Sequence, residues 1–376
     1  MAPAPTTAYR PLARALLAVA APLLLGGIWA GLLRLGWGLP PLQPQLAHAH
    51  GPLFVSGVLG TVIGLERAVA LGRRWAFAGP ALSGLGGLAL LAGLPAALGA
   101  GLMALGSLAL LAVFGAIIRR QPARFTVTMA LGALAWLGGN LLWLAGRPFA
   151  LVALWWAGFL VLTIAGERLE LGRLRQLPPH ALWIFTFAVG ALLAGLATAA
   201  VTFDAGARLA GASLAALALW MLRYDIARRT VRKPGLPRFS AICILSGSAW
   251  LALGGALYTV AGALYAGPLY DAMLHAVFVG FVFAMIFGHA PIVFPAVIGV
   301  PVAFLRAAYL PLAVLHLSLA LRLAGDLAGL GEVRRWGGLL NGAAILLFAA
   351  VTLLAARRAR SRAAPPQAAP PAGVPR

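Results

Sequence analysis

Hydrophobic residues fall in long runs along the chain, separated by charged residues or by Pro and Gly. A helix needs about 20 apolar residues to cross the hydrocarbon core of a bilayer, which is roughly 30 Å thick. The pattern therefore predicts an all-α polytopic bundle of about twelve transmembrane helices, with residues 1–356 forming a single transmembrane domain. The expected helices lie near 12–37, 50–71, 76–97, 98–118, 124–145, 149–170, 181–203, 206–223, 239–262, 269–293, 303–323 and 335–356.

The composition supports a lipid environment. Hydrophobic residues make up 62% of the 376 positions and charged residues only 10%, whereas a soluble domain carries about 25% charged residues. The lipid bilayer is therefore an expected partner. Cys243 is the only cysteine, which excludes an intramolecular disulfide and a four-cysteine zinc site.

The net charge of +21 does not indicate a nucleic-acid partner, because the basic residues occur in short clusters between apolar runs. Lys and Arg are enriched on the cytoplasmic side of membranes. If the N-terminus is cytoplasmic, 23 of the 29 Lys and Arg are cytoplasmic. The other six are Arg34, Arg147, Arg208, Arg322, Arg334 and Arg335. We therefore expect a multi-pass protein of the bacterial inner membrane with both termini in the cytoplasm. The basic, Pro/Ala-rich tail at 357–376 is expected to be disordered.

Three segments form a weak internal repeat: GVLGTVIGLER (57–67), GFLVLTIAGER (158–168) and GFVFAMIFGHA (280–290). In each, Gly lies nine residues and Ile three residues before a titratable residue, which is Glu66, Glu167 or His289. These residues end the second, sixth and tenth expected helices on the cytoplasmic side. The repeat predicts three four-helix units around a pseudo-threefold axis.

Two interpretations of Glu66, Glu167 and His289 remain open. The glutamates can simply pair with the arginines that follow them and anchor the helices at the membrane surface. Alternatively, the three residues meet at the central axis and bind a divalent metal or relay protons.

Three histidines lie at the external side. His48 and His50 open the second helix, and His275 lies near the external start of the tenth, at a depth similar to His50. Two imidazoles facing each other can occupy both axial positions of a haem b iron. With His48 added, the set could bind copper or another divalent metal. The third alternative is that His48 and His50 are interfacial loop residues without a ligand.

Helical spacing leaves the choice between His48 and His50 open. On a regular helix at 3.6 residues per turn, His50 lies nearly opposite Glu66, whereas His48 shares its face. His275 and His289 share one face and are about 21 Å apart at about 1.5 Å per residue. His316 is expected to be a hydrogen-bonded core residue. Asp225 and Glu170 are expected to be solvated partners of neighbouring arginines.

The arrangement resembles subunit I of the haem-copper oxidases: twelve helices, a His followed by Gly at the start of helix two, and a His near the outer end of helix ten. It is more specifically similar to the NnrS-like branch, which is associated with nitric oxide and denitrification. The resemblance covers about residues 12–356. It implies that His50, which precedes Gly51, and His275 ligate a low-spin haem.

The departures from the oxidases are informative. Helix six carries Trp155-Trp156, helix seven has no His, and helix ten has one external His. The resemblance therefore does not extend to an oxygen-reducing haem-copper centre. We expect a haem- or metal-binding protein with a redox partner or small-molecule ligand, not a classical enzyme. The alternative is a secondary transporter of a small solute or metal ion, because twelve helices with internal repeats also suit transport.

Overall fold

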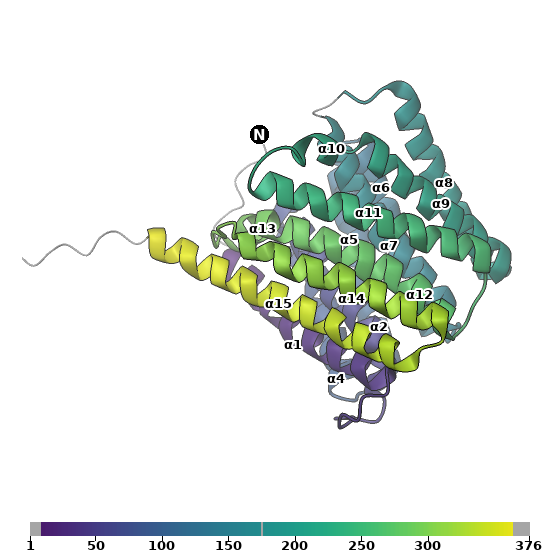
Figure 1. The fold of residues 1–376 in the computed structure, drawn as a ribbon. Coiled ribbons are helices and arrows are strands. Elements are labelled where there is room, and N and C mark those ends of the chain that lie inside the picture. Colours follow the sequence, from purple (N-terminus) through teal and green to yellow (C-terminus); the bar gives the residue numbers. More distant parts are fainter. Residues whose placement is uncertain (1–8, 174–175, 364–376) are drawn as a thin grey trace, which may run out of the picture.

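The computed structural model describes residues 9–173 and 176–363, and this part of the chain is helical with no strand. Ten of its twelve crossings each consist mainly of one α-helix (Figure 1). These helices are α1 Arg10–Arg34, α4 Ala78–Leu91, α5 Ala96–Arg120, α6 Arg124–Leu144, α7 Phe149–Gly172, α8 Pro179–Val201, α9 Phe203–Tyr224, α11 Leu236–Ala261, α14 Tyr309–Ala328 and α15 Gly331–Ala363. A short helix, α10 Ala227–Thr230, connects α9 to α11.

The two remaining crossings are composite. The second crossing consists of η2 Leu46–Ala49, α2 His50–Pro52, η3 Leu53–Leu59 and α3 Gly60–Leu71. The tenth crossing consists of α12 Pro268–His275, η6 Ala276–Phe283 and α13 Ala284–Ile298. In both, the middle segment is a π-helix.

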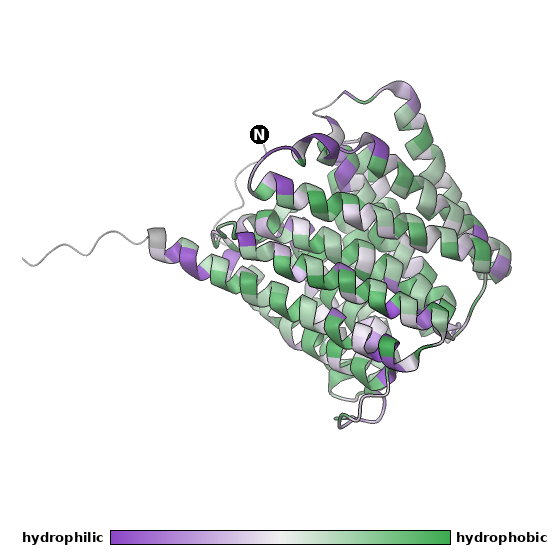
Figure 2. Ribbon diagram, viewed as in Figure 1, coloured by the Kyte–Doolittle hydropathy of each residue, from purple (hydrophilic) through white to green (hydrophobic). Residues whose placement is uncertain are grey.

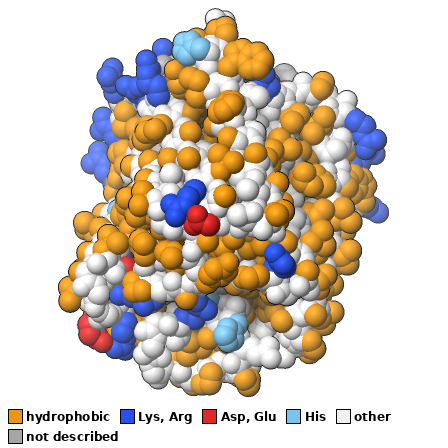
Figure 3. Space-filling model, turned by 90° about the vertical axis from the view of Figure 1, so that its right-hand side faces the viewer, with side chains coloured by type: hydrophobic (Ala, Val, Ile, Leu, Met, Phe, Trp, Pro, Cys, Tyr) orange, Lys and Arg blue, Asp and Glu red, His pale blue; other side chains and the backbone are white. Residues whose placement is uncertain are grey.

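Within the described residues, eleven crossings are long and apolar enough to span a bilayer. The remaining one, α4, is preceded by the 3₁₀ turn η4 Arg74–Phe77. At about 2.0 and 1.5 Å per residue, η4 and α4 together rise about 29 Å, close to the thickness of the hydrocarbon core. Hydrophilic positions gather near helix ends and around α10 (Figure 2), and apolar side chains dominate the face shown in Figure 3. The protein is a multi-pass membrane protein.

The crossings alternate in direction, so the bundle has two distinct ends. We call the end that carries Arg67, Arg168 and α10 the basic end, and the end that carries His50 and His275 the histidine end. The start of α1 and the end of α15 both lie at the basic end (Figure 1).

Every fourth crossing is central. In α7, the sixth crossing, 89% of the membrane-spanning positions are buried, and in the second and tenth crossings 61% are buried. The corresponding share is 22% in α1 and at most 56% in the others that qualify as spans. This burial pattern agrees with three four-helix units, each contributing its second helix to the centre.

Most predicted helix boundaries lie within about five residues of the observed ones, and the helix expected at 303–323 is shifted to Tyr309–Ala328. The expected helix at 76–97 ends at Leu91, because Gly93 adopts a positive φ of 73° and Pro95 opens α5. The predicted disordered tail was wrong for residues 357–363, which continue α15. The rest of that predicted tail, 364–376, lies outside the described residues.

Candidate functional site

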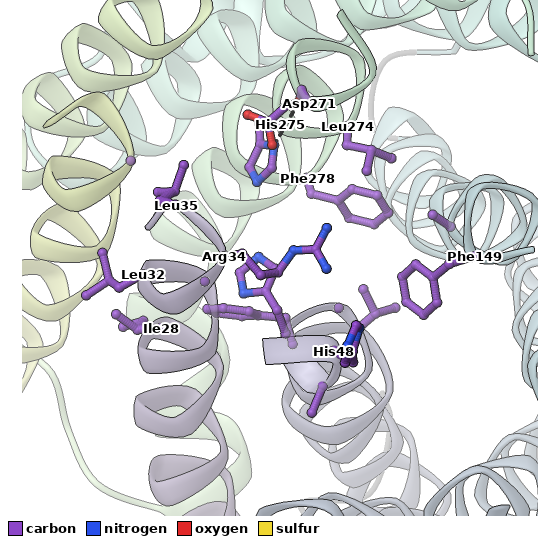
Figure 4. A pocket seen from close by; sticks show the side chains of 18 of the residues that line it. Ile28, Leu32, Arg34, Leu35, His48, Phe149, Asp271, Leu274, His275 and Phe278 are labelled. Atoms are coloured by element: carbon purple, nitrogen blue, oxygen red, sulfur yellow. Dashed lines mark hydrogen bonds and ion pairs between the residues drawn. The ribbon is translucent and has the colours of Figure 1, made fainter. Parts of the chain in front are cut away.

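A cavity of about 430 Å³ lies at the histidine end, within the range of cofactor and ligand sites. Most of its lining comes from α1, the second and tenth crossings, α7 and α15, with single residues from α4, α5, α6 and α14. Aromatic and aliphatic side chains make up much of the lining, and those labelled in Figure 4 include Ile28, Leu32, Phe149 and Phe278. The cavity is therefore mainly apolar, with a few polar groups placed around it.

His50 and His275 face each other across this cavity. Their ring centres are 6.4 Å apart, and the ring planes differ by 25°. A histidine nitrogen binds a transition metal at about 2.0 Å, and the ring centre lies about 1 Å behind that nitrogen, so two imidazoles on opposite sides of one metal have centres about 6 Å apart. The observed separation fits this arrangement.

Each of these rings is oriented by a backbone carbonyl. The Nδ1 atom of His50 lies 2.8 Å from the oxygen of Gly27, and Nδ1 of His275 lies 2.8 Å from the oxygen of Asp271. A carbonyl can only accept, so each Nδ1 carries the proton and each Nε2 keeps its lone pair. Metal-binding histidines are held by the same kind of outer hydrogen bond.

Glycines on α1 and α2 make room for this site. A Cβ atom added to Gly31 would lie 2.7 Å from Cε1 of His50, and one added to Gly51 would lie 2.9 Å from the ring of Phe149. The imidazole of His50 can therefore lie against α1 only because position 31 has no side chain.

The π-helices η3 and η6 begin shortly after the two histidines. η3 starts at Leu53, three residues after His50, and η6 starts at Ala276, directly after His275. A π-helix turns less per residue than an α-helix, so η3 changes which face His50 occupies relative to Glu66. Regular helical spacing, which aligned His48 with Glu66, therefore does not apply to this crossing.

His48 lines the same cavity but is exposed. In the view of Figure 4, Arg34 lies between His48 and His275. Across residues 9–173 and 176–363, no group of three or more His, Cys, Asp or Glu side chains is placed to hold a metal ion. The geometry thus distinguishes the His50–His275 pair from a three-histidine set.

Three arginines also line the cavity. Arg322 makes a two-point ion pair with Asp271, with nitrogen–oxygen distances of 2.8 and 2.9 Å, and Arg334 lies 3.7 Å from the same carboxylate. Arg34 is exposed at the rim (Figure 4). Arg334 also lies 3.1 Å from the buried carboxylate of Asp326. The three guanidinium groups thus exceed the two carboxylates beside them by one charge, which favours a ligand that carries negative charge.

A buried amide braces the cavity wall. Asn140 accepts hydrogen bonds from Ser56 in η3 (2.9 Å) and from the indole of Trp156 (3.0 Å). Its NH₂ group donates to the oxygen of Met103 (3.1 Å) and to Ser107 (3.2 Å). Asn140 therefore ties the π-helix and a cavity-lining tryptophan to α5, and a buried polar group satisfied in this way stabilises one packing arrangement.

At the basic end, Glu66, Glu167 and His289 each lie beside an arginine. Arg67 pairs with Glu66 (3.2 Å) and, across helices, with Glu167. The nitrogen Nε2 of His289 lies 3.5 Å from the guanidinium of Arg168. The central helices do meet here, but the arginines occupy the contacts between the titratable groups.

Asp225 differs from its expected place. It is buried and forms a two-point pair with Arg168 at 2.6 and 2.7 Å, and it also accepts a bond from the backbone of Ala227. The interpretation as a solvated partner was wrong for Asp225, because its side chain has no exposed surface and its oxygens contact Arg168 and the first residue of α10. Glu170 does form a partly exposed pair with Arg173.

His316 is a hydrogen-bonded core residue, as expected. Its Nδ1 accepts from the indole of Trp250 (3.0 Å) and its Nε2 donates to Ser246 (2.8 Å). Both ring nitrogens are therefore engaged, which separates His316 from His50 and His275.

A sequence model of the family described as "Domain of unknown function (DUF8744)" matches residues 13–357. The chain belongs to this family. The matched region runs from the first turn of α1 into the last part of α15, so the family domain contains all twelve crossings and the whole cavity. No curated protein and no solved structure matches the chain.

Within this family domain, the sequence indicated the two histidines but not the arginines around them. Arg34, Arg322 and Arg334 belong to three different helix ends, and only their membrane side was predicted. A useful signal was present: only six arginines were assigned to the side of the bundle opposite the basic clusters, and half of those six line the cavity.

Proposed function

We propose that this membrane protein binds haem b between His50 and His275, as its resemblance to the NnrS-like proteins implies. The proposal rests on one observation: two oriented imidazoles, whose Nε2 atoms have no hydrogen-bond partner among the described residues, have ring centres 6.4 Å apart across a largely apolar cavity. We further propose a role in nitric oxide response or denitrification as a redox or sensing component, without oxygen reduction.

The surrounding residues suit this cofactor. The aromatic and aliphatic lining offers an apolar environment for a porphyrin ring, and Arg34, Arg322 and Arg334 offer cations for its two carboxylates. Held by His50 and His275, haem would supply one-electron transfer. Gly27 and Asp271 would hold the two imidazoles in place through their carbonyls, and the arginines would pair with the carboxylates.

An absorption spectrum of the detergent-purified protein, expressed with added haem precursor, tests this proposal. We expect a Soret band and sharp α and β bands after reduction, with about one haem per chain by the pyridine haemochrome assay. A colourless preparation that stays colourless after haem is added back would contradict the proposal.

A secondary transporter remains the second candidate function. The π-helical interruptions in the two central crossings favour it, because transporters place substrate sites where inner helices depart from regular geometry. If the purified protein is colourless, metal analysis would distinguish a transporter of copper or another divalent metal, which should retain the metal, from a transporter of an organic solute.

We also propose that the basic end faces the cytoplasm of a bacterial inner membrane, because Lys and Arg are enriched on that side. Reporter fusions after Arg229 and at the C-terminus should both report a cytoplasmic location. A periplasmic signal from both fusions would mean that the orientation is reversed, and a periplasmic signal from only one would mean that the number of crossings is wrong.

A further inference from the structure

A second hollow lies at the basic end, between α9, α10 and α11. It is an open groove of about 540 Å³. One part of its lining is aliphatic, formed by Leu219, Leu222 and Leu245, and the other part is basic, formed by Arg223, Arg228 and Arg232. The groove therefore joins an apolar surface to a cluster of positive charge at the level where the crossings end.

The three arginines have no carboxylate partners among the described residues. The only nearby acid along the chain is Asp225, which is buried and paired with Arg168. Arg228 donates to the backbone oxygen of Arg223 (3.2 Å), and the guanidinium of Arg223 lies 5.2 Å from the ring centre of Tyr224. All three arginines are exposed, so their charges are available to an anion.

Enrichment of basic residues on one side of a membrane accounts for arginines anywhere at this end. It does not account for three of them lining the same groove as aliphatic side chains. Leu219 is 60% exposed and lies about one turn before Arg223 on α9. Apolar contact is thus offered within the bilayer and cationic contact directly beside it.

We propose that this groove binds an anionic phospholipid of the surrounding leaflet. Its phosphate lies among Arg223, Arg228 and Arg232, and its acyl chains lie along Leu219 and Leu245. Guanidinium groups suit phosphate oxygens because they donate two parallel hydrogen bonds, and basic pockets between transmembrane helices bind anionic headgroups in this way. A soluble anion would use the arginines but would have no use for the aliphatic wall.

The proposal is tested with the full-length protein in detergent, exposed to phosphatidylglycerol or phosphatidylcholine and analysed by native mass spectrometry. The test variant is R223Q/R228Q/R232Q. The matched control is R73Q/R74Q/R120Q, which removes the same charge from exposed arginines at the same end that do not line the groove. Size-exclusion elution checks that each variant is folded.

We expect the wild type and the control to retain phosphatidylglycerol and to bind phosphatidylcholine weakly. The test variant should bind phosphatidylglycerol about one hundredfold more weakly, because each basic residue near an anionic headgroup contributes about fivefold. Equal losses in both triple variants would overturn the proposal, since they would indicate only general surface charge. Equal binding of the two lipids by the wild type would also overturn it.

Two further arms complete the test. Leu219→Trp fills the aliphatic side without changing charge, at a lipid-exposed position that tolerates a large side chain. It should weaken phosphatidylglycerol binding even if the triple variant does not fold, and unchanged binding would contradict the acyl-chain contact. Inorganic phosphate at millimolar concentration should not displace the lipid, and full displacement would identify a phosphate site instead.

Discussion

The second and tenth crossings carry titratable residues at both ends, and the two ends are organised differently. At the histidine end, His50 and His275 each use Nδ1 for a backbone carbonyl, and both residues line the cavity. At the basic end, Nε2 of His289 lies 3.5 Å from Arg168, and Arg67 connects Glu66 to Glu167. The same helices therefore present available ligands at one end and paired charges at the other.

This difference teaches how to separate a binding site from a structural brace in an apolar bundle. Position in the membrane and residue type are similar at the two ends, and both were candidates for metal. The distinguishing property is whether a cationic or hydrogen-bonding group already lies beside the Nε2 atom of each histidine. The variants below test whether this property decides which end binds the cofactor.

The largest expected effect is that of His275→Ala. It removes one of two axial ligands, and the neighbouring Leu274 and Phe278 cannot replace an imidazole, so bound haem and its reduced α band should be lost or strongly shifted. His50→Ala should behave alike, whereas His48→Ala and His289→Ala should leave the reduced spectrum intact. If His289→Ala removes the cofactor and His275→Ala does not, the roles of the two ends are reversed.

The next effect concerns the stability of the basic end. Arg168→Ala leaves the carboxylate of Asp225 buried without its two-point partner, which typically costs about 3–5 kcal/mol. Thermal unfolding in detergent should show the loss, while the haem spectrum of the folded fraction stays unchanged. Arg173→Ala is the matched control: it removes the exposed pair with Glu170 and a cation–π contact with Phe125, and should cost less than about 2 kcal/mol. A spectral change in Arg168→Ala would mean that the two ends are coupled.

A smaller effect is expected from Gly31→Ala. The added methyl group would lie 2.7 Å from the His50 ring and displace it, and overpacking of this kind costs about 1–3 kcal/mol. Haem retention during purification should fall by about tenfold, which corresponds to about 1.4 kcal/mol. Gly101→Ala is the control, because nothing lies within 4 Å of a Cβ at that position. Full retention in Gly31→Ala would show that His50 does not need its present position.

The smallest effect is expected from Arg34→Gln. A positive charge near a haem favours the reduced form, so its removal should lower the midpoint potential. Arg34 is exposed at the rim and its charge is screened by solvent, so we expect about 20 mV, a twofold change in the equilibrium constant. Redox titration measures this shift, with Arg147→Gln as control, since Arg147 lies at the same end but not in the cavity lining. A shift of equal size in the control would exclude a local role for Arg34.

The sequence predicted the helices well because hydrophobic run length alone determines whether a segment crosses a bilayer. Three short repeats also predicted three four-helix units, and a central position of the second, sixth and tenth crossings was one of the two interpretations left open. It did not predict η3 or η6, because no residue in LFVSGVL or AVFVGFVF marks the change from α to π geometry. Consequently the rotation of His50 relative to Glu66 could not be calculated from spacing.

The ionic contacts were harder to predict than the helices. Arg168 follows Glu167 directly, and spacing alone gave no reason to pair it with Asp225, which lies 57 positions further on. Such pairs depend on the rotation of each helix about its axis, which apolar periodicity defines poorly when lipid and protein interior are equally apolar. The arginines of the cavity were missed for the same reason.

The burial of α7 has a consequence for how the protein is made. Chains are synthesised from the N-terminus, so α7 enters the bilayer before α8 to α15 exist to enclose it. During that interval lipid is its only solvent, and its mean hydropathy of 2.1 lets it insert as an independent helix. The later helices must then displace those lipids as they assemble around α7. The sequence of α7 must therefore suit insertion into lipid before it suits packing against protein. This accounts for a mean hydropathy close to that of α1, which is 2.2, although α1 is far less buried in the bundle.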